Sequence, residues 1–275
     1  MKRFLNPLMA ASVVVLASAC AKVERIEVKP AKVALSEAGQ SVALSAKGVT
    51  AEGEPVEKAE LAFASTNAKV ATVDAAGKVT AVKSGSANIT ITSGEVSASA
   101  PVEVVIPSAI VIQGAPFTLT GLGSEAVLEA EVKDDAGRPV KDAKLEYAAA
   151  DASVVQVEGN KLTAKAVGTA KVTATSGKLT QEFEVTVKLP EVDAVAFETV
   201  PATLKVGESA ALAVVAKGTD GAAIQGVSFT FTTSDEKIAT VDAAGNVKAV
   251  KAGAVTIKAE GGSKAAETKL TIKKK

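Results

Sequence analysis

The sequence predicts an all-β protein made of three tandem antiparallel β-sandwiches that follow a secretory signal peptide. Three observations lead to this prediction: a repeat of 84 residues, apolar residues that alternate with polar ones inside each repeat, and a short apolar stretch behind two basic residues at the N-terminus. With 275 residues, of which 47% are hydrophobic and 23% charged, the chain can bury several small cores.

The N-terminus has the parts of an export signal. Lys2 and Arg3 precede an apolar run from about Leu8 to Ala17, which is too short to span a bilayer as a helix. Residues 1–19 are therefore predicted to be a signal peptide, and the rest of the chain is predicted to be exported.

The end of this segment, Leu16-Ala17-Ser18-Ala19-Cys20, resembles the lipobox of bacterial lipoproteins. The resemblance implies that Cys20 carries acyl chains, that residues 20–22 form the lipid-anchor segment, and that the protein is attached to a membrane of the bacterial cell envelope. Two or three acyl chains anchor a protein firmly. We expect the outer membrane, on either its periplasmic or its surface face. The alternative is cleavage by the ordinary signal peptidase after Ala17-Ser18-Ala19, which releases a soluble protein.

Glycine and aromatic positions define the repeat. The positions that recur every 84 residues include Gly39, Gly123 and Gly207, then Gly53, Gly137 and Gly221, and then Phe63, Tyr147 and Phe231. They divide the chain into module one (residues 23–105), module two (residues 106–190) and module three (residues 191–275). Each module is predicted to be one domain.

Apolar and polar residues alternate within the modules, as in NITI (Asn88–Ile91), FEVTV (Phe183–Val187) and KLTI (Lys269–Ile272). This period of two, with many Val, Thr and Ile residues, indicates half-buried strands. Gly or Pro interrupts the pattern about every 8–12 residues, which is typical of an antiparallel β-sandwich.

The recurring aromatic residue is expected to point into the core of each sandwich. Phe63, Tyr147 and Phe231 hold the same position in the three modules, and each module needs one large core side chain. The alternative is a platform on which a ligand stacks.

The stretch VDAAGKVTAV (Val73–Val82) recurs as VDAAGNVKAV (Val241–Val250), so Asp74 and Asp242 are either chemical groups or turn residues. The pattern predicts a three-residue hairpin loop, in which Asp begins a type I turn and Gly takes the left-handed position. Module two is one residue shorter here, and its Gly159-Asn160 suits a two-residue primed turn.

These stretches carry a family resemblance. VALSEAGQSVAL (Val33–Leu44), LKVGESAALAV (Leu204–Val214) and KVATVDAAGKVTAVKSGSANITI (Lys69–Ile91) resemble the bacterial immunoglobulin-like domain, group 2, of invasin- and intimin-type surface proteins. The resemblance is strongest in modules one and three. It implies three immunoglobulin-like sandwiches that act as a non-catalytic spacer, adhesion or protein-interaction array on the cell envelope.

Composition excludes several classes of function. The 31 basic and 31 acidic residues give a net charge of zero and form no basic stripe, so no nucleic-acid partner is expected. The sequence has no histidine, so imidazole-based catalytic sites and histidine-ligated metals are excluded, and neither an enzyme nor a cofactor is expected. A polysaccharide- or peptidoglycan-binding protein stays the alternative, although aromatic residues make up only 3% of the chain.

Acidic residues leave one metal hypothesis open. Glu191 and Asp193 lie near the boundary between modules two and three, where clustered oxygen ligands would hold Ca²⁺. Asp134-Asp135 lies in a turn inside module two. All four acidic residues are expected to be solvated turn residues rather than metal ligands, and the residues that contact a protein or envelope-polymer partner are unknown.

Overall fold

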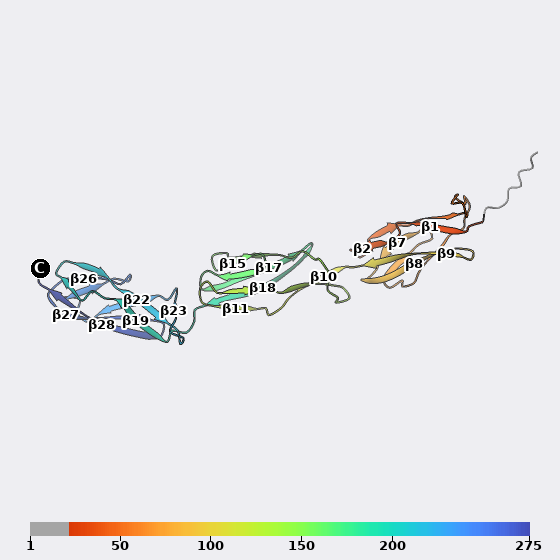
Figure 1. The fold of residues 1–275 in the computed structure, drawn as a ribbon. Helices are drawn as coiled ribbons and strands as arrows, with labels where there is room; N and C mark the ends of the chain where they lie inside the picture. The colour runs from red at the N-terminus through yellow and green to blue at the C-terminus, as the bar shows by residue number, and fades with distance from the viewer. Residues whose placement is uncertain (1–21) are drawn as a thin grey trace, which may run out of the picture. The chain divides into compact units, whose positions relative to one another are not determined.

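The computed structural model describes residues 22–275. Cys20 and the predicted signal peptide therefore lie outside the described residues. Within that range every regular element is a β-strand, and the described chain has no helix, as Figure 1 shows. The all-β prediction is confirmed.

Module one contains three sheets. Its strands are β1 (Arg25–Lys29), β2 (Val33–Leu35), β3 (Ser41–Ala43), β4 (Ser45–Val49), β5 (Ala62–Ser65), β6 (Ala71–Val73), β7 (Lys78–Ala81), β8 (Gly85–Ser93) and β9 (Val96–Val104). The sheets have the orders β2-β9-β8-β5, β3-β7-β6 and β1-β4. β1 pairs antiparallel with β4, whereas β2 pairs in parallel with β9. The parallel pair departs from the antiparallel prediction, because the chain crosses between sheets after β1 and keeps its direction.

Module two repeats these sheet orders. Its strands are β10 (Pro107–Ile112), β11 (Phe117–Thr120), β12 (Glu125–Val127), β13 (Ala130–Asp134), β14 (Glu146–Ala149), β15 (Val155–Glu158), β16 (Lys161–Ala164), β17 (Gly168–Ser176) and β18 (Leu179–Lys188). The sheets are β11-β18-β17-β14, β12-β16-β15 and β10-β13. β11 is again parallel to the last strand, β18.

Module three has the same plan with one additional short strand. Its strands are β19 (Ala194–Thr199), β20 (Thr203–Lys205), β21 (Ser209–Ala211), β22 (Ala213–Lys217), β23 (Ala223–Ile224), β24 (Phe229–Thr233), β25 (Ala239–Val241), β26 (Asn246–Ala249), β27 (Gly253–Gly261) and β28 (Lys264–Lys273). The sheets are β20-β28-β27-β24, β21-β26-β25 and β19-β22-β23. β20 runs parallel to β28.

Alternation along the long strands builds the cores. In β8, Ile89 and Ile91 are fully buried, while the residues between and beside them are partly or fully exposed. Each such side chain contributes roughly 1.5–3 kcal/mol by its burial. The aromatic residues Phe63, Tyr147 and Phe231 are partly buried and pack against the cores, which confirms their predicted inward direction. Burial raises the pKa of Tyr147.

The chain separates into two compact units. The first contains residues up to Pro107 together with the turn Asp134–Arg138, and the second contains Ser108–Lys133 and Pro139–Lys275. The turn at Asp134–Arg138 follows β13 in module two, yet it groups with module one. The division into three domains stays a prediction.

Candidate functional site

The repeated VDAAG motif forms a hairpin turn. Oδ1 of Asp74 accepts hydrogen bonds from the backbone N–H groups of Ala76 and Lys78, both at 2.9 Å. The N–H of Gly77 donates to the Asp74 carbonyl oxygen at 3.0 Å, and Gly77 has a φ of +79°. The predicted type I turn with a left-handed glycine is therefore confirmed in module one.

The second copy of the motif has the same geometry. Oδ1 of Asp242 accepts hydrogen bonds from the N–H groups of Ala244 at 3.0 Å and Asn246 at 2.8 Å, and Gly245 has a φ of +79°. The side chain of Asn246 also donates to Oδ2 at 2.9 Å. Hydrogen bonds from the Asn246 side chain, and then from its backbone, lower the pKa of Asp242. Both aspartates therefore stabilise turns.

The shorter hairpin of module two also follows the prediction. Glu158 pairs with Lys161, so the loop contains only Gly159 and Asn160. Gly159 has a φ of +59°, whereas Asn160 does not have a positive φ. This combination is that of a type II′ turn, one of the two primed turns that fit a two-residue hairpin.

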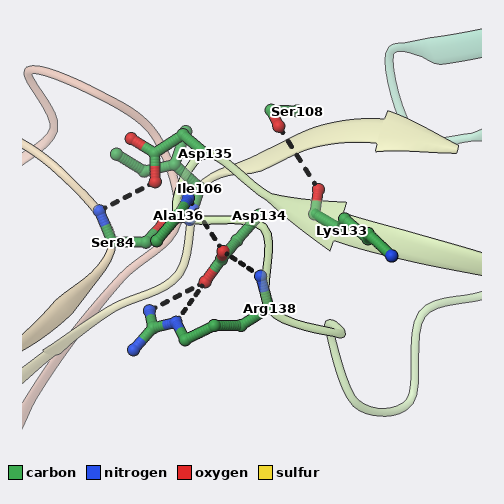
Figure 2. Close-up of polar contacts among 8 residues, drawn as sticks. All are labelled: Ser84, Ile106, Ser108, Lys133, Asp134, Asp135, Ala136 and Arg138. Carbon is green, nitrogen blue, oxygen red and sulfur yellow. Dashed lines mark hydrogen bonds and ion pairs between the residues drawn. The ribbon is translucent and has the colours of Figure 1, made fainter.

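A polar cluster surrounds the turn after β13, as Figure 2 shows. Oδ1 of Asp134 accepts hydrogen bonds from the N–H groups of Ala136 and Arg138, each at 2.9 Å. Its Oδ2 accepts hydrogen bonds from Nε of Arg138 at 2.9 Å and from Nη2 at 2.7 Å. The carboxylate thus stabilises the turn and binds the guanidinium through two nitrogens.

Asp134 corrects one expectation from the sequence. Its side chain is only 3% exposed, so it is not a solvated turn residue. Burial by itself would raise the pKa of Asp134, but the hydrogen bonds from the Arg138 side chain, Arg138 N–H and Ala136 N–H, and the charge of Arg138, lower it. The difference arises because the carboxylate has an internal partner for every oxygen.

Asp135 forms hydrogen bonds with two residues that belong to the same compact unit, Ser84 and Ile106. Its Oδ1 accepts a hydrogen bond from the Ser84 N–H at 3.0 Å, and its own N–H donates to the Ile106 carbonyl oxygen at 3.0 Å. The Ile106 N–H donates to Oγ of Ser84 at 2.7 Å. Three hydrogen bonds therefore close a ring among Ser84, Ile106 and Asp135. Asp135 is an exposed turn residue, as predicted, and its carboxylate in addition accepts a hydrogen bond from a specific backbone donor.

The acidic residues near the boundary between modules two and three do not gather. Asp193 lies 3.8 Å from Nζ of Lys264, and Glu191 is exposed. Among residues 22–275, no three side chains of the His, Cys, Asp and Glu types form a group that can hold a metal ion. Calcium binding stays an untested hypothesis. No helix within the described part of the chain is long and apolar enough to cross a membrane.

A groove of about 300 Å³ lies between β10 and β18 in module two. Its apolar lining includes Ile110, Ile112 and the buried ring of Phe183, and its rim carries the exposed side chains of Glu182 and Glu184. Sequence reasoning did not find these residues, because alternation in FEVTV identifies strand faces but not whether another strand covers the edge.

In each module the first two strands belong to different sheets, as β1 and β2 do in module one. Tandem sandwiches of this kind form a class of protein, the arrays of immunoglobulin-like β-sandwiches. The chain belongs to the family of the bacterial Ig-like domain (group 2), which matches residues 22–104 and 191–272. The two matched segments correspond to modules one and three, and module two lies between them.

Three solved structures illustrate the similarity. Domains 1–6 of the surface layer protein SbsC have 18% identity over 91% of this chain and 40% of that chain, with a TM-score of 0.32. Invasin, a bacterial integrin-binding protein, has 13% identity over 90% of this chain and 58% of its own, with a TM-score of 0.38. An E-to-A variant of titin domains I67–I69 has 11% identity over 91% and 98% of the two chains, with a TM-score of 0.49. The chain thus spans less than half of the SbsC fragment. No curated protein matches it.

Proposed function

We propose that the chain is a non-catalytic, lipid-anchored protein of the bacterial cell envelope, whose tandem immunoglobulin-like domains act as a spacer, adhesion or protein-interaction array. The proposal rests on the family membership of modules one and three and on the repeated sheet orders of all three modules. Fold by itself does not determine function. The strongest support for the proposal is therefore the structural role of the aspartates in the two VDAAG turns.

The observation that carries the proposal is the geometry of the two VDAAG turns. Each repeated aspartate accepts two backbone hydrogen bonds within its own loop, and each is exposed at the end of a hairpin. What the chain repeats is therefore a folding element rather than a reactive group. A repeated folding element is what a spacer or display array requires.

The alternative, a polysaccharide- or peptidoglycan-binding protein, has no specific observation in its favour. Its typical signature is an exposed aromatic surface, but Phe63, Tyr147 and Phe231 pack against the cores. Sedimentation of the protein with purified peptidoglycan, at a level above a denatured control, would favour that alternative over the proposed one.

The lipid anchor is tested at Cys20. Cys20→Ser is expected to abolish incorporation of a labelled fatty acid and to release the protein from membranes, because serine offers no thiol for acylation. The matched control is Ser18→Ala, which keeps a small residue in the same segment and is expected to retain the label. Membrane attachment of the Cys20→Ser protein would contradict the anchor.

Protease treatment of intact cells tests the display role. An array that reaches an external partner is expected to be cleaved in intact cells, and a periplasmic spacer only after the outer membrane is opened. Cleavage in neither condition, for a chain that is cleaved when purified, would place the protein away from both locations and contradict the proposal.

A further inference from the structure

The first half of β18 has an open edge. β18 pairs with β17 along its length, but β11 pairs with it only from Val185 to Lys188. The segment Leu179–Glu184 therefore has no ladder partner on its second side among the described strands. Nε2 of Gln181 donates to the Glu182 carbonyl oxygen at 2.9 Å, in the place that the N–H of a neighbouring strand would take.

Modules one and three close the corresponding edge. β1 packs along β9, and β19 packs along β28. Pro101 of β9 is the equivalent of Glu184 of β18. The next residues, Val102 and Val185, pair with the third residue of β8 and of β17 respectively. Proline cannot donate a ladder hydrogen bond, and it is a common means of blocking a sheet edge. Module two has Glu184 in place of this proline.

The space beside this edge has one apolar side and one acidic side. Ile110 and Phe183 are 6% and 8% exposed and lie in the floor of the groove of about 300 Å³. The ring of Phe183 is held edge-on to Phe117, with centroids 5.6 Å apart. Glu182 and Glu184 stand on the opposite, exposed face of β18, two residues apart.

These carboxylates are available to a cationic partner. Glu184 has no ion pair within the described residues. Glu182 lies 3.3 Å from Nζ of Lys171, but both side chains are about 60% exposed, and such surface pairs contribute little. No Lys or Arg of the described chain lines the groove.

We infer that the open edge of β18 binds an extended peptide segment, from a partner protein, in which basic and apolar residues alternate. The segment adds a strand beside Leu179–Glu184, as in other cases of strand addition to a sheet edge. Because side chains of a strand alternate between two faces, its Lys or Arg residues meet Glu182 and Glu184 while its apolar residues enter the groove beside Phe183. This inference rests on the proposed interaction role and gives that role a surface and a kind of partner.

The test uses a fluorescent peptide of sequence KVKIKVT and the full-length chain purified in detergent. Binding is followed by fluorescence anisotropy, and hydrogen exchange reports protection of the Leu179–Glu184 amides. We expect saturable binding with new protection of those amides. A peptide of the same composition with its three lysines in one block is the control, and it is expected to bind at least about tenfold more weakly, since it cannot match both faces of the edge.

Two variants separate strand addition from simple charge attraction. The double variant Glu182→Lys/Glu184→Lys is expected to weaken binding about tenfold or more, whereas Glu146→Lys, on β14 at the other edge of the same sheet, changes it little. Glu184→Pro reproduces the residue of module one and is expected to abolish amide protection. Circular dichroism verifies that each variant is folded, and the lysine variants keep the test decisive if Glu184→Pro does not fold.

Several outcomes overturn the inference. They are equal binding of the alternating and block peptides, binding without protection of Leu179–Glu184, or no binding at millimolar peptide. Concentration-dependent self-association that Glu184→Pro or the lysine variant removes would assign the edge to a second copy of the chain. None of these outcomes affects the Cys20 experiment, so failure of the peptide site and failure of the proposed envelope role are distinguishable.

Discussion

Gly77 tests whether packing, in addition to turn conformation, fixes the VDAAG motif. A β-carbon at Gly77 would lie 2.8 Å from the carbonyl oxygen of Leu44 and 3.1 Å from ring atoms of Phe63. Gly39, in the same module, has a φ of +77°, nearly equal to the +79° of Gly77, but a β-carbon added to Gly39 would have no other atom within 4 Å. The two glycines therefore separate the backbone cost of alanine from its steric cost.

The structure gives the expected magnitudes. Alanine at a positive φ costs roughly 1–2 kcal/mol at either position. At Gly77 a backbone oxygen and an inward aromatic ring must also move, and overpacking of this kind costs a further ~1–3 kcal/mol. Gly77→Ala is thus expected to reduce the free energy of unfolding by about 2–5 kcal/mol, and Gly39→Ala by about 1–2 kcal/mol.

Hydrogen exchange measured by mass spectrometry at increasing urea concentrations provides the assay. Peptides from module one report the unfolding of that part of the chain separately from the rest. Gly245→Ala in module three is a second trial, since its β-carbon would lie 2.9 Å from the ring of Phe231. Equal losses for Gly77→Ala and Gly39→Ala would refute the packing contribution and leave the turn conformation as the whole explanation.

Two further predictions concern polar and apolar burial. Arg138→Ala is expected to destabilise the turn of Asp134 by about 1–3 kcal/mol in urea unfolding at neutral pH, because it removes two charge-assisted hydrogen bonds. The folded-state pKa of Asp134 is lowered, so its contribution is present above the ordinary value of 3.8 and is lost as the pH falls through 3.8 toward the folded-state pKa. A stability difference between wild type and Asp134→Asn that does not change across this range would contradict that assignment. Ile257→Val, at a fully buried position, is expected to cost about 0.5–1.5 kcal/mol, against less than about 0.5 kcal/mol for Val250→Ala at a position 46% exposed; equal costs would contradict the predicted core.

Features that depend on neighbours in sequence could be predicted. The turn at Asp74 is determined within one loop, because the donors to its carboxylate are the N–H groups of Ala76 and Lys78. The same holds for Gly159, whose conformation follows from the length of its hairpin. Local hydrogen bonds and glycine conformations therefore made these parts readable from the sequence.

Features that depend on distant residues could not be predicted. Asp135 meets Ser84, 51 residues earlier, and no local pattern announces that pair. The parallel pairing of β2 with β9 depends on where the chain crosses between sheets, which alternation does not encode. Likewise, the open edge at Glu182 and Glu184 depends on where the pairing of β11 with β18 begins, at Val185, and not on the residues of β18 alone.

The parallel pairs also determine how a module responds to mechanical tension. The chain enters each module through a strand of another sheet, such as β1, which pairs with β4, then crosses to the strand that pairs in parallel with the last strand, and leaves from the end of that last strand. A pull on the two ends therefore slides the paired strands past each other, so the hydrogen bonds of the ladder bear the load together rather than opening in sequence. This ladder extends over Phe117–Thr120 in module two but only over Val33–Leu35 in module one and Thr203–Lys205 in module three. When a module is pulled at its two ends, these short ladders resist its opening together with the ladder of the first strand, which in module one joins β1 to β4.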